Sequence, residues 1–161
     1  MQNIQKILDL LSEDQKNIKR FKKGEISFEV FGENAERLGD QFFDLYQAFG
    51  FPYKNEVGEE VYQAAVTLAL HQPTENLEII FRDLQNRNED EVHPKDRAYM
   101  ADKICVHKGE AQVYGTQYKI QEGKVVFLPI KNESEVNERR RQVGMELLEE
   151  YRKKAENSLV S

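Results

Sequence analysis

The chain of 161 residues has no tryptophan and only one cysteine. Because Cys105 has no second cysteine to pair with, an internal disulfide is excluded, and the composition fits a reducing compartment. No apolar run approaches the roughly 18 residues that a membrane-spanning helix needs. Residues 1–11 mix polar and apolar side chains, unlike the apolar core of a signal peptide. We therefore expect a cytoplasmic protein with no membrane partner.

The sequence also lacks the motifs of several common chemistries. It contains no glycine-rich dinucleotide or phosphate loop and no nucleophile elbow. His93 and His107 lack metal-ligand spacing with each other or with acidic residues, so we expect no metal and no other cofactor. Lys and Arg number 23 against 29 Asp and Glu, for a formal net charge of −6. This acidic balance argues against nucleic acid as a partner, because phosphate backbones attract basic surfaces.

Most of the chain shows helical periodicity instead. A second helix is expected to start near Ser12, after a first one, and Gly144 is expected to interrupt the helical C-terminal part. We predict a mainly α (α+β) fold of about seven helices in a single domain over residues 1–161. Apolar residues recur at steps of three and four over about residues 3–12, 31–49, 58–71, 77–84 and 95–107.

The periodicity changes to two between residues 112 and 120, which predicts a strand. A second apolar run, VVFLPI, follows the dipeptide Glu122-Gly123, which suits a two-residue hairpin turn. We therefore expect one small antiparallel β-hairpin near residues 112–130, with Tyr118 opposite Phe127.

The predicted strand carries polar side chains at a density that suits a ligand pocket. Gln112, Tyr114 and Thr116 would share one face and Gln117 the other. Gly115 between them would allow a ligand or another backbone to approach closely. Amide and hydroxyl groups recognise donor and acceptor patterns but do no acid–base work at neutral pH. The favoured interpretation is a module that binds a small polar ligand; the alternative is an ordinary hairpin with a polar face.

Two residues on predicted helices suggest an enzyme. His71 ends an apolar helical stripe and could act as a general base, because imidazole titrates near neutral pH. Asp102 lies on a helix face with apolar neighbours and, if buried, needs a partner: His71, a cation or backbone amides. With Tyr114 or Thr116 as a hydroxyl donor or nucleophile, this set would form a metal-independent hydrolase or lyase.

A third interpretation is a protein-interaction domain. A contiguous exposed apolar patch on the N-terminal helices would support a protein partner. The sequence alone leaves the three functions open, and it does not decide whether the chain is an enzyme. The N-terminal helices carry more aromatic residues than a small core needs, namely Phe21, Phe28, Phe31, Phe42 and Phe43.

Several segments together resemble a known bacterial family. AYMADKICVHKGEAQVYGTQY covers residues 98–118, and VNERRRQVGMELLEEY covers residues 136–151. They resemble the signature and the closing segment of the domain-of-unknown-function family 6624, and the resemblance runs from about residue 50 to 151. Residues 1–49 would then be variable N-terminal helices. The family brings no established activity, so the resemblance implies a site at the predicted strand without naming a reaction.

The chain departs from the family pattern at the helical end of this site. Val66 and Leu70 stand where the family usually has Trp and Gln before the helical histidine. Pro73 replaces a following Asp, and Lys103 stands where an Arg follows the helical Asp. The helical end is therefore altered, whereas the strand end is intact.

Overall fold

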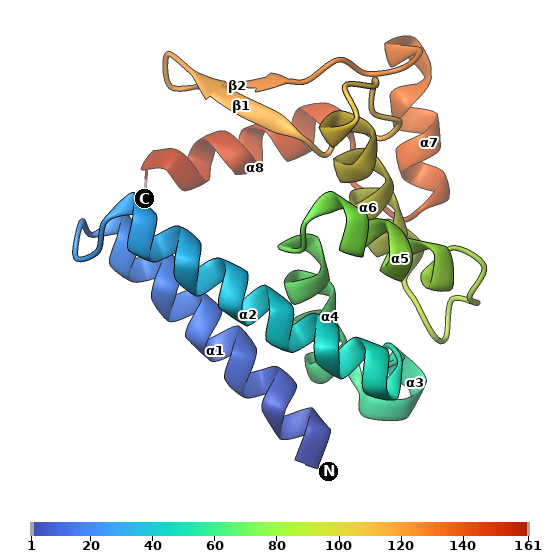
Figure 1. Cartoon of the computed structure of the whole chain (residues 1–161). Helices are drawn as coiled ribbons and strands as arrows, with labels where there is room; N and C mark the ends of the chain where they lie inside the picture. Colours follow the sequence, from blue (N-terminus) through green and yellow to red (C-terminus); the bar gives the residue numbers. More distant parts are fainter. Residues whose placement is uncertain (1, 161) are drawn as a thin grey trace. The chain divides into compact units, whose positions relative to one another are not determined.

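The computed structural model describes residues 2–160. Its architecture is mainly helical with one two-stranded antiparallel hairpin, which confirms the predicted fold class (Figure 1). By its internal contacts the chain divides into two compact units, one ending at Ile80 and the other beginning at Phe81. The single domain expected over residues 1–161 stays a prediction.

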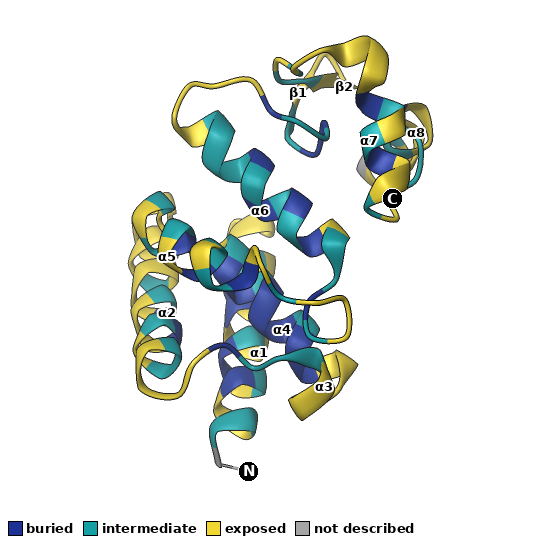
Figure 2. Cartoon of the chain, turned by 90° about the vertical axis from the view of Figure 1, so that its right-hand side faces the viewer, coloured by how far each residue is buried: buried dark blue, intermediate teal, exposed yellow. Residues whose placement is uncertain are grey.

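The first unit consists of helices. In it α4 packs against both α1 and α2. The apolar side chains of α4 are nearly all buried, which makes α4 the centre of this unit (Figure 2). The unit contains α1 (Gln2–Lys22), α2 (Phe28–Phe49), α3 (Lys54–Val57), α4 (Glu59–Leu70) and the first part of α5 (Thr74–Leu84).

α1 is one helix where the sequence analysis expected two, with a break near Ser12. The polar residues that suggested a second start make tertiary contacts instead. Asp14 and Asn17 are buried, and Asn17 Nδ2 donates to the Phe31 carbonyl at 3.0 Å. Asn34 Nδ2 in turn donates to Asn17 Oδ1 at 3.1 Å. These contacts with α2 favour one continuous helix over the local capping preference of Ser12.

α2 begins and ends at residues whose chemistry explains the boundaries. The hydroxyl oxygen of Ser27 accepts a hydrogen bond from the Val30 N–H at 3.2 Å and so caps the first turn. Gly50 ends the helix with a φ of 79°, just after the helical periodicity predicted for residues 31–49, and its N–H donates to the Tyr46 carbonyl. The four-residue α3 was not predicted, because so short a segment shows no periodicity.

The second unit combines helices with the hairpin. In this unit β2 and α7 each pack against α8. The predicted interruption at Gly144 lies between α7 and α8, where that residue has a φ of 76°. The unit contains the end of α5, α6 (Pro94–His107), β1 (Tyr118–Gln121), β2 (Lys124–Phe127), the 3-10 helix η1 (Glu133–Glu135), α7 (Val136–Gln142) and α8 (Leu148–Val160).

The hairpin has the predicted register but is shorter than predicted. Tyr118 pairs with Phe127, and both turn residues, Glu122 and Gly123, have positive φ angles, as a tight two-residue turn requires. β1 begins only at Tyr118. The preceding segment, residues 112–117, was expected to be a strand and is instead mostly irregular. Gln112 forms an isolated bridge with Ile130, but the next N–H groups, such as those of Val113 and Thr116, bond to the side chain of Asp102 rather than to a neighbouring strand.

Candidate functional site

The segment of residues 112–117, here called the YGTQ loop, folds around the carboxylate of Asp102. Asp102 lies on α6 and is fully buried. Its Oδ1 accepts hydrogen bonds from the N–H groups of Val113 at 2.7 Å and Tyr114 at 3.0 Å. Its Oδ2 accepts from the Thr116 N–H at 3.0 Å. A buried carboxylate is costly without partners, and backbone amides supply them here.

Two arginines of α7 hold the carbonyl groups of the same loop. Arg140 is fully buried, and its Nη1 donates to the Tyr114 carbonyl at 2.7 Å while its Nε donates to the Glu146 carbonyl at 2.6 Å. Arg139 Nε donates to the Val113 carbonyl at 2.8 Å. In both Val113 and Tyr114, the backbone N–H thus donates to a carboxylate and the backbone C=O accepts from a guanidinium group.

The amide side chains that were expected to bind a ligand bond to the protein itself. Gln112 is fully buried, and its Nε2 donates to the carbonyls of Gln117 at 2.8 Å and Leu128 at 2.9 Å. Its Oε1 accepts from the Gln117 N–H at 2.8 Å. Gln117 Nε2 donates to the Thr116 hydroxyl oxygen at 3.0 Å. These groups hold the loop together, and direct ligand binding by them stays a prediction.

Gly115 is required by side-chain packing. Its φ is +70°, and a Cβ at this position would lie 2.8 Å from Leu148 Cδ1 and 3.0 Å from Ile130 Cδ1. The sequence analysis expected the open side of this glycine to admit a ligand or another backbone. Two aliphatic side chains of the same unit occupy that space instead, because they pack into the volume that a Cβ would fill.

His71 belongs to the first unit, where it follows α4 and contacts α1. Its Nδ1 lies 3.1 Å from Oδ2 of Asp14, which is buried, while the imidazole itself is exposed. The enzyme interpretation paired His71 with Asp102, whose two oxygens accept hydrogen bonds from loop amides. The catalytic pair stays a prediction, and the contacts of neither side chain support it.

Tyr114 differs from the rest of the YGTQ loop because its side chain lines a pocket. This hollow, here called the Tyr114 pocket, has a volume of about 260 Å³. Residues at steps of three and four on α6 form one wall, since they share a helix face. The lining residues are Phe81, Gln85, Pro94, Arg97, Ala98, Ala101, Tyr114 and Val143.

Three of the lining side chains are polar, namely Gln85, Arg97 and Tyr114. Among the residues that the structure describes, the Gln85 amide and the Tyr114 hydroxyl have no hydrogen-bond partner. Arg97 uses Nη1, which donates to the carbonyl of Arg87, and keeps its other nitrogens for a further acceptor. Apolar walls with a few convergent polar groups are the usual form of a small-molecule site.

A pair of tyrosines packs against the other side of the loop. The Tyr151 hydroxyl donates to the Thr116 carbonyl at 3.0 Å and shares a hydrogen bond with Tyr99. The guanidinium carbon of Arg140 lies 5.0 Å from the centre of the Tyr151 ring. Burial is the main cause that raises the pKa of both phenols. Both therefore stay protonated at neutral pH and serve as hydrogen-bond donors rather than as bases.

Neither a metal site nor a reactive thiol is indicated near the loop. Within residues 2–160 there is no cluster of three or more His, Cys, Asp or Glu arranged to hold a metal ion. Burial raises the pKa of the Cys105 thiol, which disfavours the thiolate that nucleophilic catalysis needs. Over the same described range, every helix is too short or too polar to cross a bilayer.

The buried contacts of the loop come from the segments that carried the resemblance, and a family model matches residues 32–160. The chain belongs to DUF6624, a family of unknown function. The DUF6624 match starts within α2, earlier than the position near residue 50 that the sequence comparison suggested. No curated protein and no solved structure matches this chain. DUF6624 gives the chain a family without a reaction, so the function is argued from geometry.

Sequence analysis missed several residues of this site. For Arg139 and Arg140, their position in the closing DUF6624 segment was the available signal. Gln85 and Arg97 carried no signal, because nothing in the local sequence relates them to Tyr114.

Proposed function

We propose that this protein binds a small, negatively charged polar ligand in the Tyr114 pocket. One observation carries this proposal. The Gln112 and Gln117 amides and the Thr116 hydroxyl of the YGTQ loop are bonded to protein, whereas the polar side chains of the pocket, that of Tyr114 included, keep donors without protein partners. Donors that remain unpaired beside apolar walls favour recognition of a ligand with matching acceptors.

The charge of the ligand follows from Arg97. A guanidinium group is always protonated at neutral pH and presents donors in a planar fork that matches a carboxylate or a phosphate. Because Nη1 already donates to the Arg87 carbonyl, the head group is anchored rather than free to rotate. The Tyr114 hydroxyl and the Gln85 amide add a donor and an acceptor for the uncharged part of the ligand.

The volume limits the size of the ligand. About 260 Å³ lies just below the roughly 300–1,000 Å³ of pockets that hold drug-sized molecules. Phe81 and Val143 supply apolar surface opposite the polar groups. A small carboxylate with a short aliphatic or aromatic body fits these limits better than a nucleotide does.

The buried contacts of the loop position Tyr114 for ligand binding. Asp102 and Arg140 fix the backbone of Tyr114 from opposite sides, so the phenol is held in position before a ligand arrives. A site that is ordered in advance loses less entropy on binding. Asp102 and Arg140 are therefore positioning residues, which accounts for polar residues that have no direct access to a ligand.

The test uses nuclear magnetic resonance with benzoate, succinate and inorganic phosphate as probes. In the wild-type chain, at least one of the two carboxylates should shift the amide signals of Ala98, Ala101 and Tyr114, with a Kd of about 1 mM. Arg97→Gln should weaken that binding about tenfold, because it removes the charge. Arg141→Gln is the matched control, since Arg141 is exposed, pairs with Glu138 and lies outside the pocket.

The alternative outcomes are clear. If none of benzoate, succinate and inorganic phosphate shifts these signals at concentrations of about 20 mM, the pocket is not an anion site. Shifts of equal size in the wild type and in Arg97→Gln would also contradict the proposal. A response to phosphate alone would retain the anion site and replace the carboxylate by a phosphate group.

A further inference from the structure

The first unit carries an apolar groove between α1 and α2, here called the N-terminal groove. Its volume is about 510 Å³. The groove lies entirely within the first unit and shares no residue with the Tyr114 pocket. It is lined by Lys6, Asp9, Leu10, Glu13, Gln41, Asp44, Leu45, Ala48 and Phe49.

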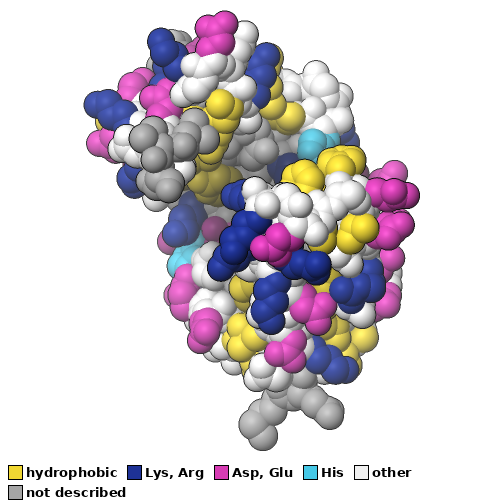
Figure 3. Space-filling view, turned by 90° about the vertical axis from the view of Figure 1, so that its left-hand side faces the viewer, with side chains coloured by type: hydrophobic (Ala, Val, Ile, Leu, Met, Phe, Trp, Pro, Cys, Tyr) yellow, Lys and Arg dark blue, Asp and Glu magenta, His cyan; other side chains and the backbone are white. Residues whose placement is uncertain are grey.

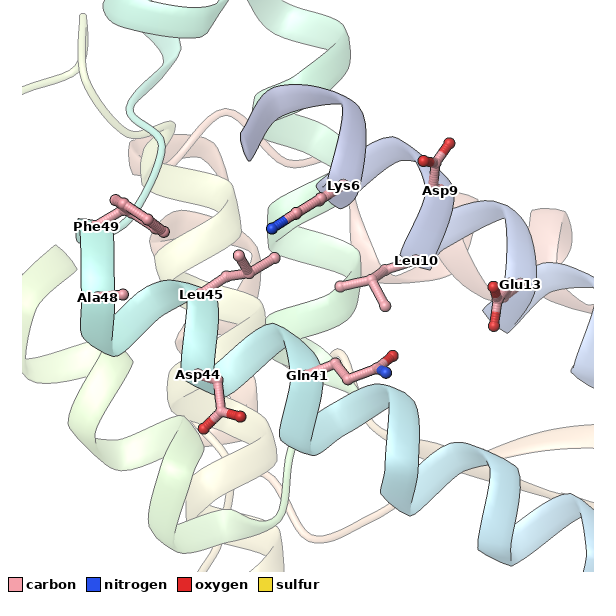
Figure 4. Close-up of a pocket in the computed structure, with 9 residues that line it drawn as sticks. All are labelled: Lys6, Asp9, Leu10, Glu13, Gln41, Asp44, Leu45, Ala48 and Phe49. Atoms are coloured by element: carbon pink, nitrogen blue, oxygen red, sulfur yellow. The ribbon is translucent and has the colours of Figure 1, made fainter. Parts of the chain in front are cut away.

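Polar contacts link the two helices on the side of the groove toward the turn that joins them. There, Asn17 bonds to the Phe31 carbonyl, and Arg37 pairs with Glu13 at 3.1 Å. Toward the open end the floor is apolar. Leu10 and Leu45 point toward one another between the helices (Figure 4).

The apolar surface extends beyond this floor. Phe49, at the last turn of α2, is 64% exposed, an unusual position for a large aromatic side chain. Leu45 and Phe49 also line a second hollow of about 150 Å³ that reaches Pro52. The aromatic residues that the sequence analysis singled out contribute little here: Phe42 is buried.

Carboxylates border both sides of the groove. Asp9 on α1 and Asp44 on α2 point away from the floor on their respective helices (Figure 4). Among the lining residues are three carboxylates and one ammonium group, that of Lys6; Glu13 is paired with Arg37, which leaves Asp9 and Asp44 as the acidic border. Basic and acidic side chains are interspersed on the face shown in Figure 3. Negative charge beside an apolar floor favours a ligand that combines an apolar surface with positive charge.

We propose that the N-terminal groove binds an amphipathic helix of a partner protein that carries Lys or Arg beside its apolar stripe. A helix seated between two helices inserts side chains at i, i+3, i+4 and i+7 into the apolar floor. Basic residues flanking that stripe then lie near Asp9 and Asp44. Charge complementarity of this kind raises the association rate and selects the partner.

The same charges argue against the other occupants of an apolar face. A second copy of this chain would bring Asp9 and Asp44 of one groove against those of the other, within a chain whose net charge is −6. Like charges that face each other across an interface cost binding energy. An anionic lipid surface would be repelled for the same reason.

The experiment uses two synthetic helical peptides of about 18 residues, or five turns. Both have Leu at helical spacing; one has Lys and the other Glu at the remaining positions. The full chain should bind the Leu/Lys peptide with a Kd of about 10 μM in fluorescence anisotropy, and the Leu/Glu peptide at least tenfold more weakly. Vesicles of anionic phospholipid and light scattering of the chain alone test the other occupants.

Three variants locate the binding. Phe49→Ala should weaken binding of the Leu/Lys peptide by about fivefold or more, because it removes exposed apolar surface from the groove. Phe28→Ala is the control: Phe28 is 77% exposed on the same helix but does not line the groove, so binding should be unchanged. Asp44→Lys should weaken binding of the Leu/Lys peptide and strengthen binding of the Leu/Glu peptide.

Several results would overturn the proposal. They are the absence of peptide binding, equal effects of Phe49→Ala and Phe28→Ala, and no response to Asp44→Lys. Self-association that Phe49→Ala abolishes would assign the groove to a second copy. Vesicle binding that Phe49→Ala abolishes would assign it to a membrane surface.

Discussion

Asp14 in the first unit and Asp102 in the second are buried aspartates on helices, and their carboxylates have different partners. Asp14 on α1 pairs with the exposed imidazole of His71. Asp102 on α6 accepts hydrogen bonds from three amides of an irregular loop. In the first unit the backbone groups of the helices bond to one another, so the backbone does not need the Asp14 carboxylate as an acceptor. In the second unit the loop backbone depends on the carboxylate, because buried N–H groups need acceptors.

This difference shows what determines each region. The first unit is held by helices whose apolar faces meet, with α4 at their centre. In the second unit the YGTQ loop is held by buried charged and polar groups, above all Asp102 and Arg140. Substitutions of polar residues should therefore be much more costly around the loop than at comparable positions in the first unit.

The largest expected effect is the difference between Asp102→Ala and Asp14→Ala. Asp102→Ala leaves three N–H groups of the loop without an acceptor, that of the buried Thr116 included, and should lower the free energy of unfolding by about 3–5 kcal/mol. Asp14→Ala removes one partner of an exposed histidine and should cost about 1 kcal/mol. Urea unfolding followed by circular dichroism measures both. Hydrogen exchange should show faster exchange of the Val113, Tyr114 and Thr116 amides in Asp102→Ala alone.

Asp102→Asn serves as the conservative control for this comparison. Asparagine keeps one acceptor oxygen and has an NH2 donor in place of the other. Asp102→Asn should therefore lower the free energy of unfolding by less than Asp102→Ala does. If Asp102→Ala and Asp14→Ala destabilise the chain equally, the YGTQ loop does not depend on the carboxylate and the comparison between the units fails.

A second pair of variants tests the carbonyl side of the loop. Arg140→Met keeps an unbranched chain next to Tyr151 but removes the bonds to the carbonyls of Tyr114 and Glu146. It should cost about 2–4 kcal/mol, because charged hydrogen bonds in a buried position are lost. Arg141→Met, on the same helix but exposed, should change stability by less than about 0.5 kcal/mol. Thermal unfolding with equal losses in both variants would show that Arg140 has no special role.

The sequence predicted those parts of the fold that depend on local chemistry. The helix stop at Gly50, the hairpin turn at Glu122 and Gly123, and the pairing of Tyr118 with Phe127 were all confirmed. Each follows from a residue and its near neighbours. The break expected near Ser12 was wrong, because contacts of α1 with α2 outweigh a local cap.

The sequence pointed to the YGTQ loop but did not predict the contacts that the side chains of this loop make. Tyr114 lines a pocket, but the Gln112 side chain bonds to backbone groups of Gln117, and the Gln117 side chain donates to the Thr116 hydroxyl oxygen. Polar alternation along a segment has the same appearance whether the side chains face a ligand or replace strand hydrogen bonds. The deciding contacts, from Asp102 and Arg140, are distant in sequence, so periodicity does not reveal them.

Two glycines with the same backbone angle sharpen the comparison at smaller cost. Gly115 in the loop and Gly24 between α1 and α2 both have a φ of +70°. A Cβ on Gly24 meets open space, whereas one on Gly115 would lie 2.8 Å from Leu148 Cδ1. Gly24→Ala should cost about 1 kcal/mol for the backbone angle alone. Gly115→Ala should cost about 2–3 kcal/mol, since overpacking is added.

The measurement is the urea midpoint of the two alanine variants beside the wild type. Because the backbone angle is matched, the difference between them reports packing of Leu148 and Ile130 against the loop. Equal losses would mean that these side chains move away from the new methyl group, and that the loop is packed more loosely than its buried polar contacts indicate.

The smallest effect concerns the tyrosines beside the loop. Tyr151→Phe removes the hydrogen bond to the Thr116 carbonyl and should cost about 1 kcal/mol at neutral pH. Tyr114→Phe is the control, because its hydroxyl has no partner among the described residues, and stability should stay unchanged.

The pH dependence of that effect has a definite sign. Burial raises the pKa of Tyr99 and Tyr151, so the folded chain keeps protons that the unfolded chain releases. Their contribution to stability is therefore complete below the unfolded pKa of about 10 and is lost as the pH rises above it. Urea midpoints measured across this range should fall less steeply in Tyr151→Phe than in the wild type. Parallel curves would show that Tyr151 ionises as freely in the folded chain as in the unfolded one, and that the side of the loop facing α8 is open to water.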